Sequence, residues 1–461
     1  MPKEGRYRVR RDRVQALLTL ALLNIFVLVA GVVAQDVIAS RPPETMPYPV
    51  AHAEEAPDPA TSDAEPVDPD RLADKLDDRM SDSGIDDGLY AYVVDAETGQ
   101  ELFARDETGV AVPASTTKLV TAVATLHAVG PGEHITTEVV QGSAPDEVVL
   151  VGAGDSTLTE EVEPGAYPRP ATMEELAEST AHKLSAAGVD SVSLGYDDSL
   201  YPGSDMAPGW KQGYVDEGST ATVHALMLDG GRVYKEQNYS QRVGDPPLAA
   251  AQAFARRLEA VGITVEGAPS PVRAPDGAEA VASVDSPPIS ALVEKMMLDS
   301  DNVMAEVLAR QVALAEGEEP SFGGASAAVH AVMEELGIPD VHVEDASGLS
   351  VNNRITPEAL VDLLLLASGD EHPDLHAVLS GLPTAHFTGT LDDRYSDYSQ
   401  SAAGAGLIRA KTGTLNGVST LAGLAYDAEG RLMVFAFMAN DPAAQGSTLD
   451  TFATVLAECG C

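Results

Sequence analysis

The stretch VPASTTKLVTAVATL, residues 112–126, places a serine and a lysine three positions apart at the start of an apolar helix. Side chains at positions i and i+3 lie on one face of a helix, so Ser115 and Lys118 can touch. Near a helix N-terminus the backbone N–H groups lack partners and the helix dipole favours negative charge. A lysine buried there loses part of its preference for a proton and can accept one from the serine. The alternative is a serine that caps the helix and a lysine that reaches solvent along its stem.

A second polar group interrupts the apolar stretch MMLDSDNVMAEVLAR, residues 296–310. Ser300 and Asn302 flank an expected break between two helices, where a hydroxyl can relay protons and an amide can bind an amide substrate. The alternative is a simple helix cap, since serine and asparagine favour that position. A rival S-x-N at Ser350 and Asn352 lies in a polar loop instead.

A third group opens the stretch IRAKTGTLNGVSTLAGL, residues 408–424. Lys411 and Thr412 can hold a carboxylate, and Gly413 lets a substrate backbone approach closely. The alternative is an ordinary turn before a hairpin.

The order of the three motifs is more specific than any one of them. S-x-x-K, then S-D-N, then K-T-G is the triple of class A β-lactamases and penicillin-binding proteins. The chain resembles most the low-mass class C penicillin-binding proteins, the D-alanyl-D-alanine carboxypeptidase/endopeptidase group. Further similar segments are GAGDSTLT (152–159), DASGLSVNNR (345–354) and FTGTLDDRY (387–395). The resemblance covers about residues 80–458.

The resemblance implies an α/β (α+β) fold of the β-lactamase and penicillin-binding transpeptidase type, an antiparallel sheet with a helical cluster. The gap of 185 residues between Ser115 and Ser300 is too long for a minimal core. Alternating helix and strand patterns within it indicate an inserted α/β domain. We therefore expect the peptidase domain at 71–144 and 286–461, with the insert at 145–285.

The resemblance also implies a mechanism on peptidoglycan stem peptides that end in D-Ala-D-Ala. Ser115 is the expected nucleophile, and Lys118 is the expected general base, with Lys411 left open as an alternative. Ser300 is expected to pass the proton to the leaving nitrogen, and Asn302 to hold the substrate amide.

The expected binding residues complete that site. Lys411 and Thr412 are expected to bind the terminal carboxylate, and Gly413 to let the substrate backbone approach. The backbone N–H groups of Ser115 and Thr414 are expected to form the oxyanion hole.

Relatives also bind the free end of the stem's diaminopimelate. Arg354 aligns with the arginine of that subsite. Trp210 of the insert is the candidate aromatic residue, with a core position between the domains as the alternative, and Asp216 is the acid that we assign to the subsite. β-Lactams are the expected inhibitors.

No metal or cofactor is expected, since the histidines have no zinc spacing. Two alternatives stay open: a secreted serine β-lactamase, and a non-catalytic envelope protein on the same fold. The net charge of −44 repels nucleic acid and anionic lipid, so neither is an expected ligand.

The N-terminal region indicates export. A basic tail, 1–13, precedes the uncharged segment 14–35, which is long enough to span a bilayer. Arginines before this segment place the tail in the cytoplasm and the remainder outside. We expect an uncleaved anchor as the one contact with the membrane, with a cleaved signal peptide as the alternative. Residues 36–70, rich in Pro, Ala and acid, form an expected disordered linker.

Both cysteines, Cys459 and Cys461, lie at the C-terminus. They can bond to each other, bond between chains or stay free, and we expect the tip to be disordered.

Overall fold

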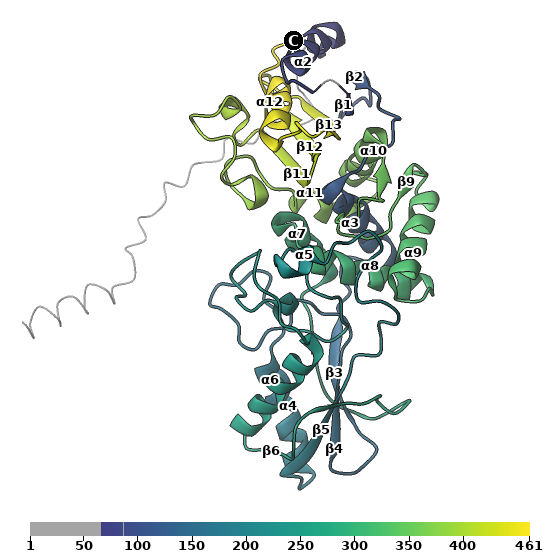
Figure 1. Ribbon diagram of the computed structural model, residues 1–461, viewed down its shortest axis with the longest axis vertical. Coiled ribbons are helices and arrows are strands. Elements are labelled where there is room, and N and C mark those ends of the chain that lie inside the picture. Colours follow the sequence, from purple (N-terminus) through teal and green to yellow (C-terminus); the bar gives the residue numbers. More distant parts are fainter. Residues whose placement is uncertain (1–65, 86) are drawn as a thin grey trace, which may run out of the picture. The chain divides into compact units, whose positions relative to one another are not determined.

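The computed structural model describes residues 66–85 and 87–461. These residues form one compact unit, which Figure 1 shows in colour. The expectations for 1–13 and 14–35, and for all but the end of 36–70, lie outside the described residues. No helix among those described is long and apolar enough to cross a membrane.

One antiparallel sheet joins the two ends of this unit. Its strand order is β11-β12-β13-β1-β2, so the N-terminal hairpin pairs with the C-terminal strands through β1 and β13. The strands are β1 (Leu89–Asp95), β2 (Glu101–Arg105), β11 (Ile408–Leu415), β12 (Val418–Tyr426) and β13 (Leu432–Ala439). The hairpin predicted from the sequence is present.

Both faces of this sheet are covered, which explains why β12 and β13 are buried at almost every position. Phe435 and Phe437 of β13 pack with α2 (Pro69–Ser81) and α12 (Gly446–Ala457) on one face. The alternate residues Val434 and Ala436 pack on the other face in the core of the helical cluster. Because successive side chains of a strand point to opposite faces, β13 contributes to two hydrophobic cores.

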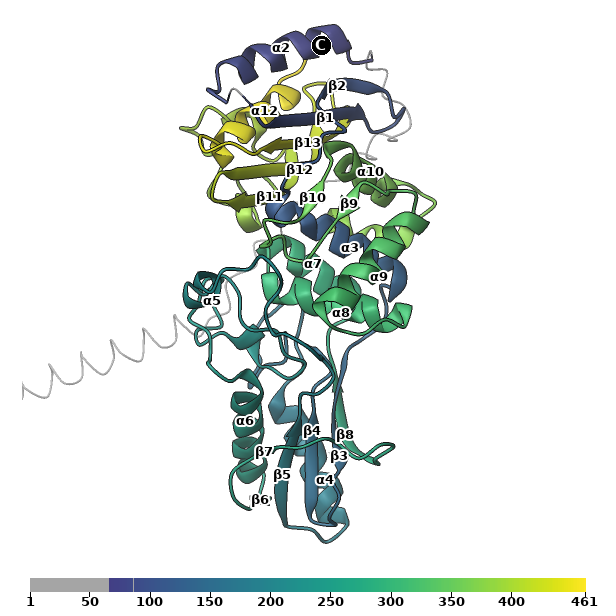
Figure 2. The same cartoon turned by 45° about the vertical axis from the view of Figure 1, so that its right-hand side comes forward.

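The helical cluster surrounds α3 (Thr117–Ala128), whose residues 117–126 are all buried. Four longer helices of the cluster and the short α11 (Ala377–Ser380) contact this helix, and Figure 2 shows the four longer ones around it. The four are α7 (Ile289–Asp299), α8 (Asn302–Glu316), α9 (Phe322–Glu335) and α10 (Pro357–Ser368). A helix buried on every side is a rigid support for the residues at its N-terminus.

The inserted lobe carries a second sheet of order β6-β5-β4-β3-β8, with β7 paired to β5. Helices α4 and α6 contact each other and pack on this sheet. The elements are β3 (Thr136–Gln141), β4 (Glu147–Val151), β5 (Ser191–Asp197), β6 (Thr264–Val265), β7 (Ser270–Pro271), β8 (Ala280–Asp285), α4 (Met173–Ala186) and α6 (Pro246–Ala260).

The insert begins earlier than the expected residue 145. Strand β3 belongs to its sheet, because Thr136 pairs with Asp285 at the far end of the insert. A pairing between residues so distant in the chain leaves no local pattern. The outgoing and returning segments therefore leave the helical cluster side by side.

The C-terminal tip differs from the expected disorder. Cys459 and Cys461 are bonded to each other in a disulfide and are buried against the core that α12 helps to form. The carbonyl of Cys461 accepts a hydrogen bond of 2.8 Å from the backbone N–H of Asp68. Asp68 is also the N-cap of α2, a helix that was not predicted.

Candidate active site

Ser115 lies in a short 3-10 turn, η1 (Ala114–Thr116), that leads directly into α3. Its predecessor Ala114 has a left-handed φ of 47°, a conformation that costs about 1 kcal/mol or more and persists only where neighbours impose it. Thr420 of β12 donates to the Pro113 carbonyl at 2.7 Å. Asn440 accepts from the Val112 N–H at 2.7 Å. The sheet thus fixes the segment before the serine.

Lys118 is fully buried, and its ammonium lies among three oxygens. The Nζ atom is 3.1 Å from Ser115 Oγ, 2.6 Å from Asn302 Oδ1 and 2.7 Å from the Ser347 carbonyl. Because an ammonium has three donors, this set satisfies it completely. Residues from the first and second motifs therefore meet at one nitrogen.

The second lysine forms a parallel arrangement. Lys411 Nζ donates to Ser300 Oγ at 2.9 Å and to the carbonyl of its neighbour Thr412 at 2.9 Å. Ser300 has a left-handed φ of 56° and ends α7 directly before Asp301, the N-cap of α8. Each lysine is thus paired with one serine.

Burial changes the charge state of both lysines. It lowers the pKa of Lys118 to about 8, although nearby Asp345, Asp301 and Glu306 act to raise it. Burial, then the positive charge of Lys118, holds the pKa of Lys411 well below its usual range. Near neutral pH a larger share of each lysine is therefore neutral than in water, and a neutral amine can accept a proton.

The outer edge of β11 is open beside the serine. The Ile408 carbonyl and the Ala410 N–H bond outward, to Ala385 and Pro383, at 2.9 Å each. Backbone direction alternates along a strand, so the N–H of Thr414 also points away from β12. The side chain of Thr414 is exposed.

Gly413 lets this strand approach the serine. A Cβ there would lie 2.9 Å from both the Ser115 nitrogen and the Pro113 carbonyl. A real side chain would push the strand away from the nucleophile. The third motif therefore needs its glycine for close approach of two backbones.

Three residues that sequence reasoning missed contact this group. Thr390 Oγ1 shares a hydrogen bond of 2.8 Å with Thr412 Oγ1. The Ser219 carbonyl of the insert accepts from Asn302 Nδ2 at 2.9 Å. Arg232 of the insert pairs with the Asp of the second motif. None belongs to a motif, and only the FTGTLDDRY similarity pointed to the segment that holds Thr390.

The residues assigned to the diaminopimelate subsite are not all together. Trp210 is half-buried, and its Nε1 donates to Asp345 Oδ2 at 2.7 Å. Arg354 is exposed at the start of β10 (Arg354–Ile355), and its guanidinium donates to the Val351 carbonyl at 2.8 Å. Asp216 is exposed at the end of α5 (Gly213–Asp216). No hydrogen bond among the described residues joins Asp216 to either.

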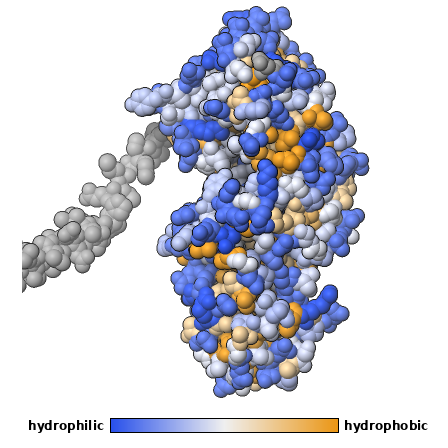
Figure 3. All heavy atoms as spheres, viewed as in Figure 1, coloured by the Kyte–Doolittle hydropathy of each residue, from blue (hydrophilic) through white to orange (hydrophobic). Residues whose placement is uncertain are grey.

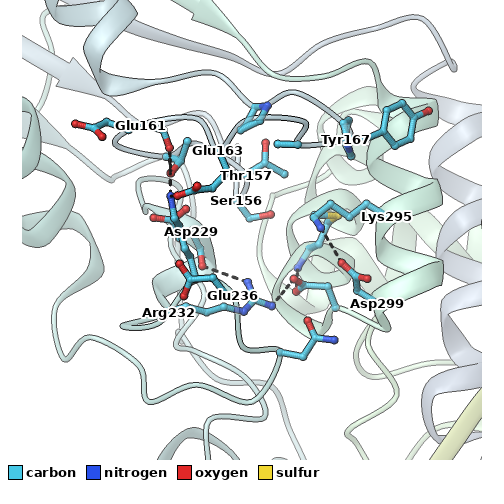
Figure 4. A pocket seen from close by; sticks show the side chains of 18 residues that line it. Ser156, Thr157, Glu161, Glu163, Tyr167, Asp229, Arg232, Glu236, Lys295 and Asp299 are labelled. Atoms are coloured by element: carbon cyan, nitrogen blue, oxygen red, sulfur yellow. Dashed lines mark hydrogen bonds and ion pairs between the residues drawn. The ribbon is translucent and has the colours of Figure 1, made fainter. Parts of the chain in front are cut away.

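A separate cavity of about 300 Å³ lies beside the second motif, with Asp301 in its lining. Its lining comes from the insert and from the junction of α7 and α8, and Figure 4 shows Arg232 reaching across from the insert. Arg232 donates to Asp301 there at 2.6 Å. The cavity includes neither Ser115 nor either catalytic-motif lysine in its lining. Within the described part of the chain, no cluster of three or more His, Cys, Asp or Glu residues could hold a metal ion.

The family model for D-Ala-D-Ala carboxypeptidase 3 (S13) matches residues 72–247 and 232–458. The chain belongs to this S13 carboxypeptidase family. A carboxypeptidase of Mycobacterium tuberculosis is 37% identical over 383 residues, covering 81% of each chain. The carboxypeptidase DacB of Mycolicibacterium smegmatis is 37% identical over 375 residues, covering 80% of each chain.

A solved structure supports the fold of this S13 member. Penicillin binding protein 4 from Haemophilus influenzae superposes with a TM-score of 0.66 at 21% identity, covering 82% of this chain and 97% of its own. The predicted β-lactamase-like α/β fold is confirmed. The predicted serine-type D-Ala-D-Ala carboxypeptidase class is confirmed by the family.

Proposed function

We propose that this chain hydrolyses the bond between the two terminal D-alanines of peptidoglycan stem peptides, through an acyl-enzyme on Ser115. The observation that carries the proposal is the contact of Ser115 Oγ with a fully buried Lys118 Nζ. Family membership supports the substrate class, since the family is described by this activity.

The partners of Lys118 support it as the general base. A neutral amine has two N–H donors and one lone pair. Asn302 Oδ1 and the Ser347 carbonyl can only accept, so they take the two N–H groups. The lone pair then faces Ser115 Oγ, the one neighbour able to donate a proton. Lys411 instead contacts Ser300, which favours Lys118 over Lys411 in this role.

The reaction proceeds in two transfers. Ser115 Oγ attacks the carbonyl carbon of the penultimate D-Ala while its proton moves to Lys118 Nζ. The C–N bond breaks as the proton held by Lys118 reaches the leaving nitrogen through the Ser300 hydroxyl, so D-Ala departs as the free amino acid and Lys118 is neutral again. Water then attacks the ester while Lys118 accepts its proton, and this proton passes to Ser115 Oγ as the ester bond breaks and the shortened peptide is released.

The remaining residues bind and polarise the substrate. The backbone N–H groups of Ser115 and Thr414 stabilise the oxyanion, supported by the outward direction of the strand edge. Lys411 and Thr412 bind the terminal carboxylate, and the Asn302 amide binds the peptide. Because a β-lactam presents a strained amide and a carboxylate in the same positions, it acylates Ser115.

For the third residue of the stem we propose Trp210 and Arg354 as neighbours of its free end. Trp210 donates a hydrogen bond to Asp345, and Arg354 follows Asp345 by nine residues in the same segment of the chain. Asp216 is part of the proposal through its sequence position alone.

We also propose that the enzyme works outside the cytoplasm, anchored by residues 14–35. The support is the basic tail before this uncharged segment. Membrane fractionation of the full chain and of a chain lacking residues 1–35 tests it. An anchor is supported if the full chain stays in the membrane fraction while the chain lacking residues 1–35 does not.

A fluorescent penicillin separates the proposed activity from that of a β-lactamase. The carboxypeptidase is expected to retain a covalent fluorescent band through denaturing electrophoresis, and Ser115→Ala is expected to lose it. Rapid hydrolysis of the penicillin without a band would contradict the proposal.

A further inference from the structure

Glu306 is a buried carboxyl group one helical turn after the second motif on α8. Its side chain is almost fully buried, at 1% exposure, and the reaction steps above do not use it. Oε1 accepts from the Ala346 N–H at 3.1 Å and from the Ser347 N–H at 2.9 Å. Oε2 also accepts from the Ala346 N–H, at 3.3 Å. The carboxylate therefore clamps two consecutive backbone amides.

The clamped backbone belongs to the turn that contacts Lys118. The Ser347 carbonyl accepts from Lys118 Nζ at 2.7 Å, and the Ala346 carbonyl accepts from Thr121 Oγ1 at 2.7 Å. The turn also makes close contact with the nucleophile's segment, because Gly348 has a φ of 83° and lies against the Ala114 carbonyl. A shift of the turn would therefore move an acceptor of the proposed base.

We propose that Glu306 is a positioning residue for the reaction, holding the Ala346–Ser347 backbone so that the Ser347 carbonyl fixes Lys118 Nζ. Without this acceptor, the neutral amine of Lys118 would be free to rotate its lone pair away from Ser115. The inference rests on the proposed role of Lys118 as the base.

Arg310, one turn further along α8, contacts Glu306. Its guanidinium donates to the Glu306 carbonyl at 2.9 Å and lies 3.9 Å from Oε2. It is also stacked over the ring of Phe322, 4.1 Å from the centroid. A buried carboxylate with two amide donors and a fixed cation is held in one orientation.

The charges around Glu306 come from several elements. Arg310 lies on its own helix, Lys118 on α3 and Asp345 in the clamped turn. Asp301, at the helix junction, acts on Lys118. The face of α9 that packs here presents Ala325, Ser326, Val329 and Phe322, none of which is charged.

The balance of these charges gives Glu306 an electrostatic role beside its structural one. Burial, then the charge of Asp345, raises the pKa of Glu306 to about 7, against Arg310 and the Ser347 hydrogen bonds. The charge of ionised Glu306 raises the pKa of Lys118. Removal of that charge therefore lowers the pKa of Lys118 and leaves more of it neutral at a given pH.

Trp210 supplies a direct optical signal from the clamped turn. It is the one tryptophan of the chain, and its Nε1 donates to Asp345, the residue next to Ala346. Its fluorescence therefore reports a displaced turn independently of activity.

The test compares Glu306→Gln and Glu306→Ala with wild type and with Glu316→Gln. Glu316 is an exposed glutamate on the same helix, so its variant is a matched control for charge removal. Acylation by a fluorescent penicillin is measured from about pH 5.5 to about pH 9.5, at subsaturating and saturating concentrations. Tryptophan emission and the melting temperature are recorded for each variant.

Glu306→Gln keeps an oxygen for the two amides but loses the charge. The acid limb of its pH–rate profile, where the acylation rate rises with pH, is expected to move to lower pH by roughly half a unit or more. The plateau rate is expected to stay within about threefold of wild type. Glu306→Ala is expected to lower the saturating rate about tenfold or more, with little change in binding and with altered Trp210 emission.

A role confined to stability would lower the melting temperature of both variants and leave the acid limb unmoved. The inference is overturned if the acid limb of Glu306→Gln coincides with those of wild type and Glu316→Gln. If Glu306→Ala does not fold, the Glu306→Gln profile decides alone. Failure of the proposed function would look different, because wild type itself would then not be acylated on Ser115.

Discussion

Arg232 of the inserted lobe donates to Asp301 of the second motif at 2.6 Å, and both side chains are largely buried. Asp301 also accepts from the Met304 N–H at 3.0 Å and so caps α8. One residue on, Asn302 donates to the Ser219 carbonyl of the same lobe. The insert is therefore part of the active-site framework, because it holds the turn between Ser300 and Asn302.

We predict that Arg232→Gln lowers kcat/KM for D-Ala release about tenfold or more, mainly through kcat. The variant leaves Asp301 without its cation, and breaking a buried pair costs about 3–5 kcal/mol. Arg232→Lys, which keeps the charge, is expected to lose less. Steady-state kinetics and a melting curve check this, and unchanged kinetics in a folded Arg232→Gln would refute the framework role.

Thr390 is predicted to support carboxylate binding through Thr412. Thr390→Val keeps the side-chain shape but removes the hydroxyl that bonds Thr412 Oγ1. A lost hydrogen bond of this kind is worth about 1 kcal/mol, so we expect KM to rise about fivefold with kcat little changed. Kinetics on a pentapeptide measure both constants. A fall in kcat at constant KM would place Thr390 in the chemical step instead.

The two lysines are predicted to respond differently to arginine, whose guanidinium stays charged. Lys118→Arg removes the base and should slow acylation about a thousandfold or more. Lys411→Arg keeps a cation for the carboxylate and should cost about one to two orders of magnitude less. Stopped-flow acylation of folded variants checks the order. The reverse order would identify Lys411 as the base.

The pH dependence of acylation follows from the lowered pKa of Lys118, about 8. The base acts only when neutral, so the rate should rise as pH increases through about 8 and level above it. The wild-type profile is the reference for both lysine variants. A rate that does not change between about pH 6 and about pH 9 would exclude Lys118.

Asp155 of the insert is predicted to make stability depend on pH. Burial raises its pKa to about 6, although Thr157 hydrogen bonds act against the shift. Its Oδ2 has no hydrogen-bond partner among the described residues. The Asp155 carboxyl therefore ionises at lower pH in the unfolded chain than in the folded one. The free energy of unfolding falls as pH rises from about 4 to about 6.

Asp155→Asn removes this titration. Relative to Asp155→Asn, wild type should lose roughly 2–3 kcal/mol of unfolding free energy across that interval. Asp276→Asn, at an exposed aspartate of the same lobe, is the control. Urea unfolding at several pH values measures the difference. Parallel pH curves for wild type and Asp155→Asn would show that Asp155 does not titrate as inferred.

The catalytic motifs could be predicted from the sequence more fully than the contacts between distant residues that hold these motifs in place. Ser115 and Lys118 share a helix face, so their contact follows from local spacing. The order of the motifs predicted that Ser300, Asn302 and Lys411 would join them, through family resemblance rather than through local physics.

Other features depend on contacts between distant residues and have no local pattern. Because β3 pairs with β8, the insert starts before the predicted residue 145. The contact of Arg232 with Asp301 joins the two lobes. The buried tip at Cys461 is held by the backbone of Asp68. The hydrophilic face seen in Figure 3 fits the acidic composition, which indicates solubility but no particular site.

The central claim is that Ser115 carries the acyl group. The direct measurement is release of D-Ala from a pentapeptide by wild type and by Ser115→Ala, with mass spectrometry of the penicillin adduct after proteolysis. The account predicts an adduct on the peptide that contains Ser115, and loss of D-Ala release in the variant. Equal release by both proteins, or an adduct on another residue, would contradict it.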